Sequence, residues 1–361
     1  MTFFVEVAEV NQLVKISYFS RRLLLTASLA LLAAGAAQAQ DVYYSQAFAN
    51  RQVQNPAWAG VLDDYSATLS FRNQFPQLAG SFVTTQVAGD VRLPQVGLHH
   101  ALGLVVNQDY AGAVGYTRLE GSTQYAYHTR LTRTLALSGG ASLGAGRQRV
   151  GYDNYTFGDQ FAADGTPLGA SAERIGDVLP RNYFTVGVGG VLYAEQGWLS
   201  LSARHLNQPD LGFRQQAVLP MQLAVSAGYK LFIQHPRGAG SRTEVREISF
   251  VPTATYTRQG GSQRSEAGLY FMAKPITLGA LYRNLTGPDL AGTQHVAALV
   301  VGIETDDFRF GYSYDVGMSN LASELGGAHE ITIAFRAFDK LESSYRRLKR
   351  RNYPVAPCPA F

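Results

Sequence analysis

Histidine and acidic side chains are the residues of this sequence whose spacing could support acid–base or metal chemistry. His99 and His100 are adjacent, and adjacent side chains of an extended strand point to opposite faces, so these two cannot chelate one ion. His329 and Glu330 could form an acid–base scheme with His128, as in a hydrolase. No motif ties a serine or threonine to them, and interior polar side chains are normal in a β-barrel. The pattern therefore favours a structural role over a catalytic, cofactor or metal site.

The elements that must position these residues are two-sided strands, and the last two strands of the chain show this best. In 308–315, four aromatic residues, among them Tyr312, alternate with small or charged residues that include Asp315. An extended backbone places all the aromatics on one face. Lipid outside and a hydrated lumen inside satisfy both faces. This environment requires a closed barrel, because lipid leaves no backbone group unpaired.

Composition agrees with one large barrel. The chain is 46% hydrophobic and 16% charged, and it contains 37 Gly, 20 Tyr and 19 Phe among 361 residues. A mean hydropathy of −0.07 fits a barrel, because only every second strand residue faces lipid. The near-neutral body of the chain gives no indication of nucleic-acid binding.

Strand-like runs bounded by Gly, Pro, Asn and Asp number about fourteen. They lie at about 65–73, 82–92, 99–107, 115–130, 134–149, 182–193, 198–205, 219–232, 245–257, 264–272, 275–283, 294–303, 307–315 and 328–338. The predicted fold is therefore all-β: a transmembrane barrel of about 14 antiparallel strands over 65–338, in the outer membrane of a Gram-negative bacterium.

Connection lengths support this topology, since a barrel with both termini in the periplasm has short inner turns and longer outer loops. The short connections are 131–133, 194–197, 273–274 and 304–306, and the longer ones are 150–181, 206–218, 284–293 and 316–327. The exception is 233–244, a long connection on the periplasmic side, which could mark a partner contact.

The first 39 residues have the features of a signal peptide. Basic residues precede the apolar run 23–37, and Ala37 and Ala39 stand where a signal peptidase reads small residues. Residues 1–39 are therefore expected to be removed on export.

Residues 40–64 are expected to form a lead-in or plug segment at the periplasmic mouth. The turn Asn55-Pro56-Ala57-Trp58-Ala59-Gly60 has an aromatic residue that needs a seat inside or beneath the barrel. The run 135–145 has small residues on one side, which either leave space or allow another segment to pack inside. Glycine pairs such as Gly139-Gly140 and Gly189-Gly190 are interpreted as sites of barrel curvature or turns rather than as ligand-binding loops. Open and plugged lumens both fit this pattern.

The last 23 residues, 339–361, differ from the barrel. Apolar residues at helical spacing lie among basic ones, including Arg346, Arg347 and Arg350. The tail is either solvated or a short basic helix that docks on a periplasmic partner or on lipid headgroups. The single cysteine, Cys358, excludes an internal disulfide.

Several short motifs, in order along nearly the whole chain, carry a resemblance to a known family. They are Gln40-Asp41, Tyr44–Gln46, Asn55–Gly60, Arg72–Phe75, Tyr282–Asn284, Gly311–Asp315, Gly326–Ile331 and Cys358–Phe361. Together they resemble the PorP/SprF family of type IX secretion system membrane proteins. Two positions depart from the family pattern, Phe75 in place of the usual Trp and Ala328 in place of the usual Ser.

The resemblance implies a non-enzymatic outer-membrane component that helps to export or anchor surface proteins such as adhesins, in bacteria where the system also serves gliding motility. It implies periplasmic partners, namely the ring lipoprotein and its companion or a peptidoglycan-binding adaptor. The outer loops 150–181, 206–218 and 316–327 would then meet cargo, whereas the tail and the connection 233–244 would meet the periplasmic secretion machinery. A passive porin or substrate-specific transporter is the first alternative, and an outer-membrane hydrolase is the second.

Overall fold

A computed structural model describes most of the chain after the expected signal peptide. The described residues are 41–63, 65–78, 80–93, 99–112, 115–151, 158–162, 166–169, 179–213, 216–234, 248–288, 292–305, 308–318 and 325–335. The predictions for the signal peptide, for most of the 233–244 connection and for the tail with Arg346, Arg347 and Arg350 lie outside these residues.

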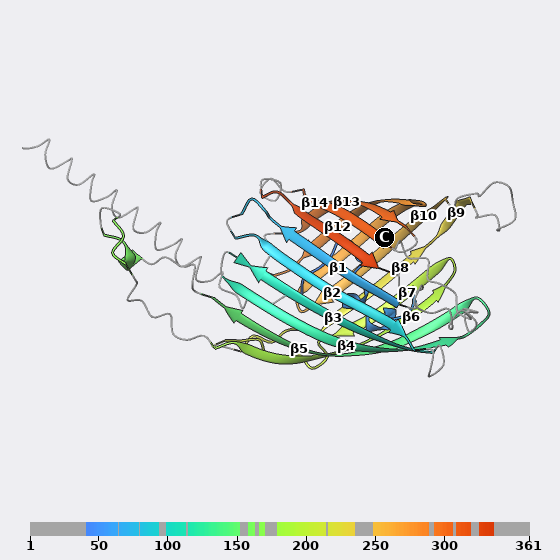
Figure 1. Cartoon of the computed structure of the whole chain (residues 1–361), viewed down its shortest axis with the longest axis horizontal. Helices are drawn as coiled ribbons and strands as arrows, with labels where there is room; N and C mark the ends of the chain where they lie inside the picture. Colours follow the sequence, from blue (N-terminus) through green and yellow to red (C-terminus); the bar gives the residue numbers. More distant parts are fainter. Residues whose placement is uncertain are drawn as a thin grey trace, which may run out of the picture. The chain divides into compact units, whose positions relative to one another are not determined.

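Fifteen described strands form one antiparallel sheet that closes on itself (Figure 1). They are β1 (Tyr65–Gln74), β2 (Phe82–Arg92), β3 (His100–Ala111), β4 (Tyr116–Arg130), β5 (Leu135–Val150), β6 (Arg181–Ala194), β7 (Gly197–Arg204), β8 (Gln222–Tyr229), β9 (Leu231–Gln234), β10 (Ile248–Gln259), β11 (Ser262–Ala273), β12 (Ile276–Thr286), β13 (Gln294–Glu304), β14 (Phe308–Gly317) and β15 (Ala328–Phe335).

Only Lys230 separates β8 from β9, and both pair with β10, so the two follow one path across the barrel. The result is a closed barrel of 14 strands, as predicted. The β14–β15 hairpin closes the ring, because β15 pairs with β1 from Phe335 opposite Ala67 to Ala328 opposite Gln74.

The two faces of the strands have the predicted character. On β14, Phe308 and Phe310 are 48% and 43% exposed on the outside of the barrel, whereas Arg309 and Asp315 are buried on the inside. Among the described residues, no helix has the length and hydrophobicity needed to cross a bilayer.

The two ends of the barrel carry different connections. We call the end where β1 begins and β15 ends the terminal end, and the opposite end the far end. Two turns at the terminal end, 195–196 and 274–275, have only two residues each. At the far end, the connection 205–221 folds back on the barrel wall and buries Leu219, whereas β10 and β11 are joined by Gly260–Gly261 alone.

The inner face is less hydrated than the sequence suggested. A buried apolar cluster joins side chains from seven strands to residues that precede β1. Its members are Phe48, Ala57, Trp58, Val61, Leu62, Ala136, Val191, Tyr193, Trp198, Val251, Tyr270, Met272, Leu281, Ala298 and Val300. This cluster explains why β13 is apolar on both faces: Ala298 and Val300 face an internal core, while Leu299 faces outward.

Candidate functional site in the barrel lumen

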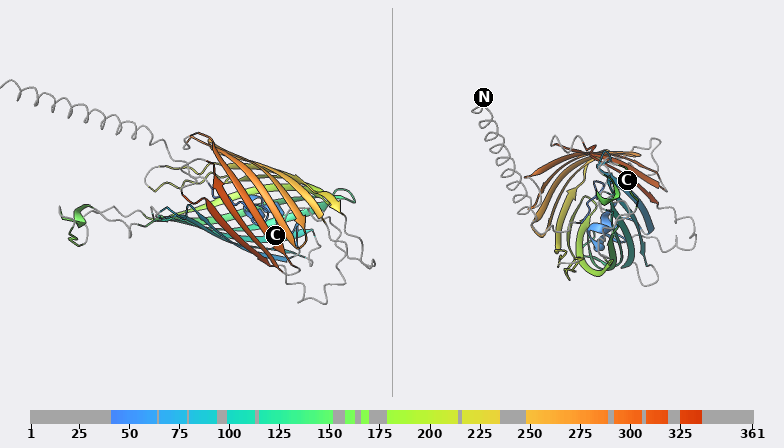
Figure 2. Two further views of the ribbon diagram at one scale, coloured as in Figure 1. Left: turned by 90° about the horizontal axis from the view of Figure 1, so that it is seen from above. Right: turned by 90° about the vertical axis from the view of Figure 1, so that its left-hand side faces the viewer.

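The residues that precede β1 lie inside the ring of strands, as the view along the barrel shows (Figure 2). We call residues 41–63 the N-terminal segment. Asp41 is bound at the far end, where Arg118 donates to Asp41 Oδ1 at 3.2 Å. Asp63 is bound at the terminal end, where Arg309 donates to its carboxylate at 2.9 Å. The segment therefore runs the length of the lumen, well beyond the one mouth where the sequence analysis placed it.

Asn55 shapes the middle of the segment. It separates the short helix α2 (Arg51–Gln54) from the 3₁₀ turn η1 (Pro56–Trp58), and its backbone is extended, with φ −154° and ψ 120°. Its Oδ1 accepts from Ala57 N at 2.9 Å, which caps the turn, and the fixed φ of Pro56 suits the first position. The same side chain joins the segment to the wall, because Nδ2 donates to Ser200 Oγ at 2.8 Å and to the carbonyls of Gly190 and Leu201.

Two glycines make room for this turn. Gly140 on β5 and Gly189 on β6 are cross-strand partners on the inner face. A Cβ at Gly140 would lie 2.5 Å from Ala57 N, and a Cβ at Gly189 would lie 1.9 Å from Asn55 Oδ1. Of the two alternatives that the small residues of β5 left open, the structure has the second, in which another segment packs against them. Gly140 and Gly189 themselves act as contact residues, which the curvature interpretation did not foresee.

Aromatic residues anchor the segment in the apolar cluster. Pro56 and Trp58 are buried, so the aromatic residue of the turn has its seat inside the barrel. Phe48 packs edge-on against Trp198 of β7 and Tyr270 of β11, with ring centroids 5.3 and 5.8 Å away. Each fully buried aromatic side chain contributes about 1.5–3 kcal/mol relative to an exposed one.

Gly60 occupies a position that other residues would strain. Its φ is +70°, and a Cβ there would lie 2.7 Å from Ala101 Cβ. Its N–H donates to Asp90 Oδ2 at 2.5 Å, and its carbonyl accepts from Arg92 Nε at 3.0 Å. Gly60 thus fixes the chain to β2 just before β1 begins.

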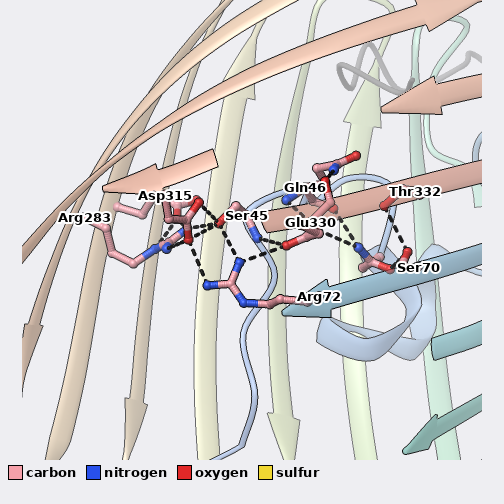
Figure 3. A network of polar contacts seen from close by, with 10 residues as sticks. Ser45, Gln46, Ser70, Arg72, Arg283, Asp315, Glu330 and Thr332 are labelled. Carbon is pink, nitrogen blue, oxygen red and sulfur yellow. Dashed lines mark hydrogen bonds and ion pairs between the residues drawn. The ribbon is translucent and has the colours of Figure 1, made fainter. Parts of the chain in front are cut away.

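Buried charges hold the far half of the segment (Figure 3). Arg72 of β1 donates to Asp315 of β14 at 2.8 Å and to Glu330 of β15 at 3.1 Å. Arg283 of β12 also pairs with Asp315, at 3.3 Å. Ser45 lies between them, and its hydroxyl is 2.6 Å from both carboxylate oxygens of Asp315.

Glu330 binds the main chain of the segment directly. Its carboxylate accepts from Ser45 N at 2.8 Å and from Gln46 N at 3.0 Å, and Asn50 Nδ2 lies 3.3 Å away. Glu330 is fully buried. A buried carboxylate is stable only when paired and hydrogen-bonded, so these donors and Arg72 depend on one another.

Tyr43 sits among three guanidinium groups. Arg283, Arg72 and Arg264 lie 4.5, 4.9 and 5.2 Å from the centre of its ring. Cations over an aromatic face are attracted to it, and desolvation strengthens the attraction.

A second charged cluster binds the start of the segment. Besides Arg118, Asp41 lies 2.6 Å from His205 Nε2 and 3.6 Å from Arg204. Glu120 completes the cluster, because Arg118 donates to it at 2.7 Å and Tyr183 at 2.6 Å.

The structure does not assemble the possible acid–base group. His329 lies on the outer face, with Nδ1 2.8 Å from the Tyr312 hydroxyl, whereas Glu330 lies on the inner face. His128 is near the terminal end, where its Nε2 is 3.0 Å from the carbonyl oxygen of Ala59. Within the described ranges, no three His, Cys, Asp or Glu residues are placed to hold a metal ion.

The site residues chosen from the sequence thus fall into separate places. Asn55, Pro56, Trp58 and Gly60 line the terminal half of the lumen. Asp315 and Glu330 bind the far half of the segment, whereas Tyr312 and His329 face outward.

Sequence reasoning missed Arg72, Arg118, Arg283 and Asp90 as binding residues. Each is a charged residue at an inward position of a strand. The alternation of inward and outward positions along a strand could have identified these residues but not their partners.

A sequence model described as "Type IX secretion system membrane protein PorP/SprF" matches residues 36–335. None of the curated proteins matches the chain.

Solved structures with a similar arrangement of strands include a monoaromatic hydrocarbon channel, CymD, at 9% identity and a TM-score of 0.43, covering 80% of this chain and 91% of the channel. The KdgM porin has 6% identity and a TM-score of 0.34, and the match covers 75% of this chain and 98% of the porin. BamA from Haemophilus ducreyi lacking POTRA domains 1–3 has 8% identity and a TM-score of 0.36, and the match covers 76% of this chain and 70% of BamA. At this level, these similarities carry no argument about function. The family match spans most of the sequence, and the chain therefore belongs to the PorP/SprF family of type IX secretion system membrane proteins.

Proposed function

We propose that this outer-membrane barrel assists the export or surface anchoring of cargo proteins by the type IX secretion system, and that its lumen is closed by the N-terminal segment. The family and the barrel fold point to a membrane component rather than an enzyme.

The observation that carries this proposal is the attachment of the segment around the ring. Its residues bond to β1, β2, β14 and β15 on one side and to β4, β6 and β7 on the other. A passive porin needs a continuous water-filled passage. Buried ion pairs and an apolar core in the same space favour a closed barrel that acts through its surfaces.

We expect the surfaces that bind cargo and machinery to be formed by connections at opposite ends of the barrel. The far-end connections 150–181, 206–218 and 316–327 would meet cargo, and the tail 339–361 with the connection 233–244 would meet periplasmic machinery. Deleting 339–361 should leave heat-modifiable folding intact and weaken co-purification with periplasmic ring components or a peptidoglycan-binding adaptor. Unchanged co-purification would exclude docking through the tail.

A secretion assay tests the proposed role. In a strain that lacks this chain, surface-exposed cargo should be lost, and complementation with the unaltered chain or with Gly139→Ala, an outward-facing change, should restore it. If surface cargo persists while uptake of small solutes falls, the chain is a porin or transporter instead.

A further inference from the structure

We infer that the far end of the lumen contains a binding site for a neutral ligand with an apolar body and amide groups, the chemistry of a peptide segment. The site is a cavity of about 280 Å³ bounded by β1, β12, β13, β14, β15 and the N-terminal segment. This volume is close to the lower limit for small-molecule pockets.

The cavity has apolar walls. Phe75, Leu285 and Val296 line it, together with Ala328 and Gly327. Phe75 adopts a left-handed backbone conformation, with φ +57°, and its N–H donates to the Gly327 carbonyl at 2.7 Å. This contact fixes the aromatic residue at the rim, so the wall is built by the fold rather than by a loose side chain.

Polar groups also line the cavity. Arg72 lines the cavity, and its guanidinium group is held in place by Asp315 at 2.8 Å and by Glu330 at 3.1 Å. Gln74 and Gln294 also line the cavity. Their amides both donate and accept, as a peptide group does.

The charges around the cavity favour a neutral ligand. The guanidinium groups near Tyr43 belong to Arg72, Arg264 and Arg283. The neighbouring carboxylates are equal in number: Glu266, Asp315 and Glu330. No net positive charge is therefore left to attract a free carboxylate, which would also have to be desolvated.

Equilibrium binding to the purified protein in detergent tests the inference. The probes are N-acetyl-phenylalaninamide and its free acid, N-acetyl-phenylalanine, measured by saturation-transfer NMR at pH 7. Val296→Phe fills the cavity from the inner face of β13. Val316→Phe is the matched control, because it makes the same exchange on the outer face of β14, where Val316 is 39% exposed.

The amide should bind saturably, about tenfold more tightly than the acid, and Val296→Phe should weaken it about tenfold while Val316→Phe leaves it unchanged. Absence of saturable binding, equal binding of the acid, or equal binding to Val296→Phe would each overturn the inference. The binding measurement is independent of the secretion assay, so the inferred binding site and the proposed role in secretion can each fail without the other.

Discussion

The substitution Gly140→Ala should loosen the N-terminal segment, whereas Gly139→Ala should not. The two glycines are neighbours on β5 and face opposite sides of the wall. A Cβ at Gly140 meets the main chain of Pro56 and Ala57, while a Cβ at Gly139 meets no described heavy atom within 4 Å. The pair thus adds the same methyl group with and without the contact.

The magnitude follows from the distances. The added Cβ would lie 2.5 Å from Ala57 N and 2.7 Å from the Pro56 carbonyl carbon, where ordinary contacts begin at 3.4 Å. The turn must retreat by about 1 Å in a close-packed interior. This strains three hydrogen bonds donated by Asn55 and one from Ser138 Oγ to the Ala57 carbonyl. These four hydrogen bonds are strained rather than broken, so at about 0.7 kcal/mol for each of them the expected loss is about 3 kcal/mol, or about a hundredfold in the ratio of seated to released segment.

Thiol labelling measures this ratio. Ala47 is buried in the segment, so Ala47→Cys in a Cys358→Ser background reacts only when the segment leaves its seat. Labelling should be about a hundredfold faster with Gly140→Ala than with Gly139→Ala. Equal rates in the two variants would refute the packing of the turn against Gly140.

Three further predictions concern other contacts. Glu330→Gln should destabilise the barrel by about 3–5 kcal/mol in denaturant unfolding, because it leaves Arg72 incompletely paired, whereas His329→Gln on the outer face should change stability by less than about 0.5 kcal/mol. Phe48→Ala should cost about 3–5 kcal/mol by opening a cavity in the apolar cluster, and a stability equal to that of Phe310→Ala, an outer-face control, would contradict the internal core. In the far-end connection 205–221, hydrogen bonds from the backbone N–H groups of Ala217 and Gly212 lower the pKa of Asp210. The turn that these bonds hold should therefore be stable above the ordinary carboxyl pKa and should loosen as pH falls through the lowered pKa. Amide exchange at Ala217 should then become faster, and Asp210→Asn should reproduce the faster exchange at neutral pH.

The strands could be predicted because lipid and lumen impose opposite demands on alternate residues. Phe308, Arg309 and Phe310 display this contrast within three positions, and the observed strand ends differ from the predicted ones by only a few residues. β13 lacked the contrast, since Val300 faces an apolar core that no local pattern reveals.

The path of the N-terminal segment could not be predicted in the same way. Ser45 and Glu330 are 285 residues apart in sequence, and nothing in the local sequence of Ser45 specifies that partner. Gly140 and Gly189 were equally uninformative alone, because a strand glycine serves curvature or close approach. Only the ring closure brings these residues together.

Single-channel recording in planar bilayers tests the central claim most directly. The unaltered protein should show no large steady conductance, because the N-terminal segment fills the lumen, and deletion of residues 41–54 should produce a stable open channel in a barrel that keeps its heat-modifiable fold. A large steady conductance from the unaltered protein, equal to that of the deletion variant, would contradict the closed barrel.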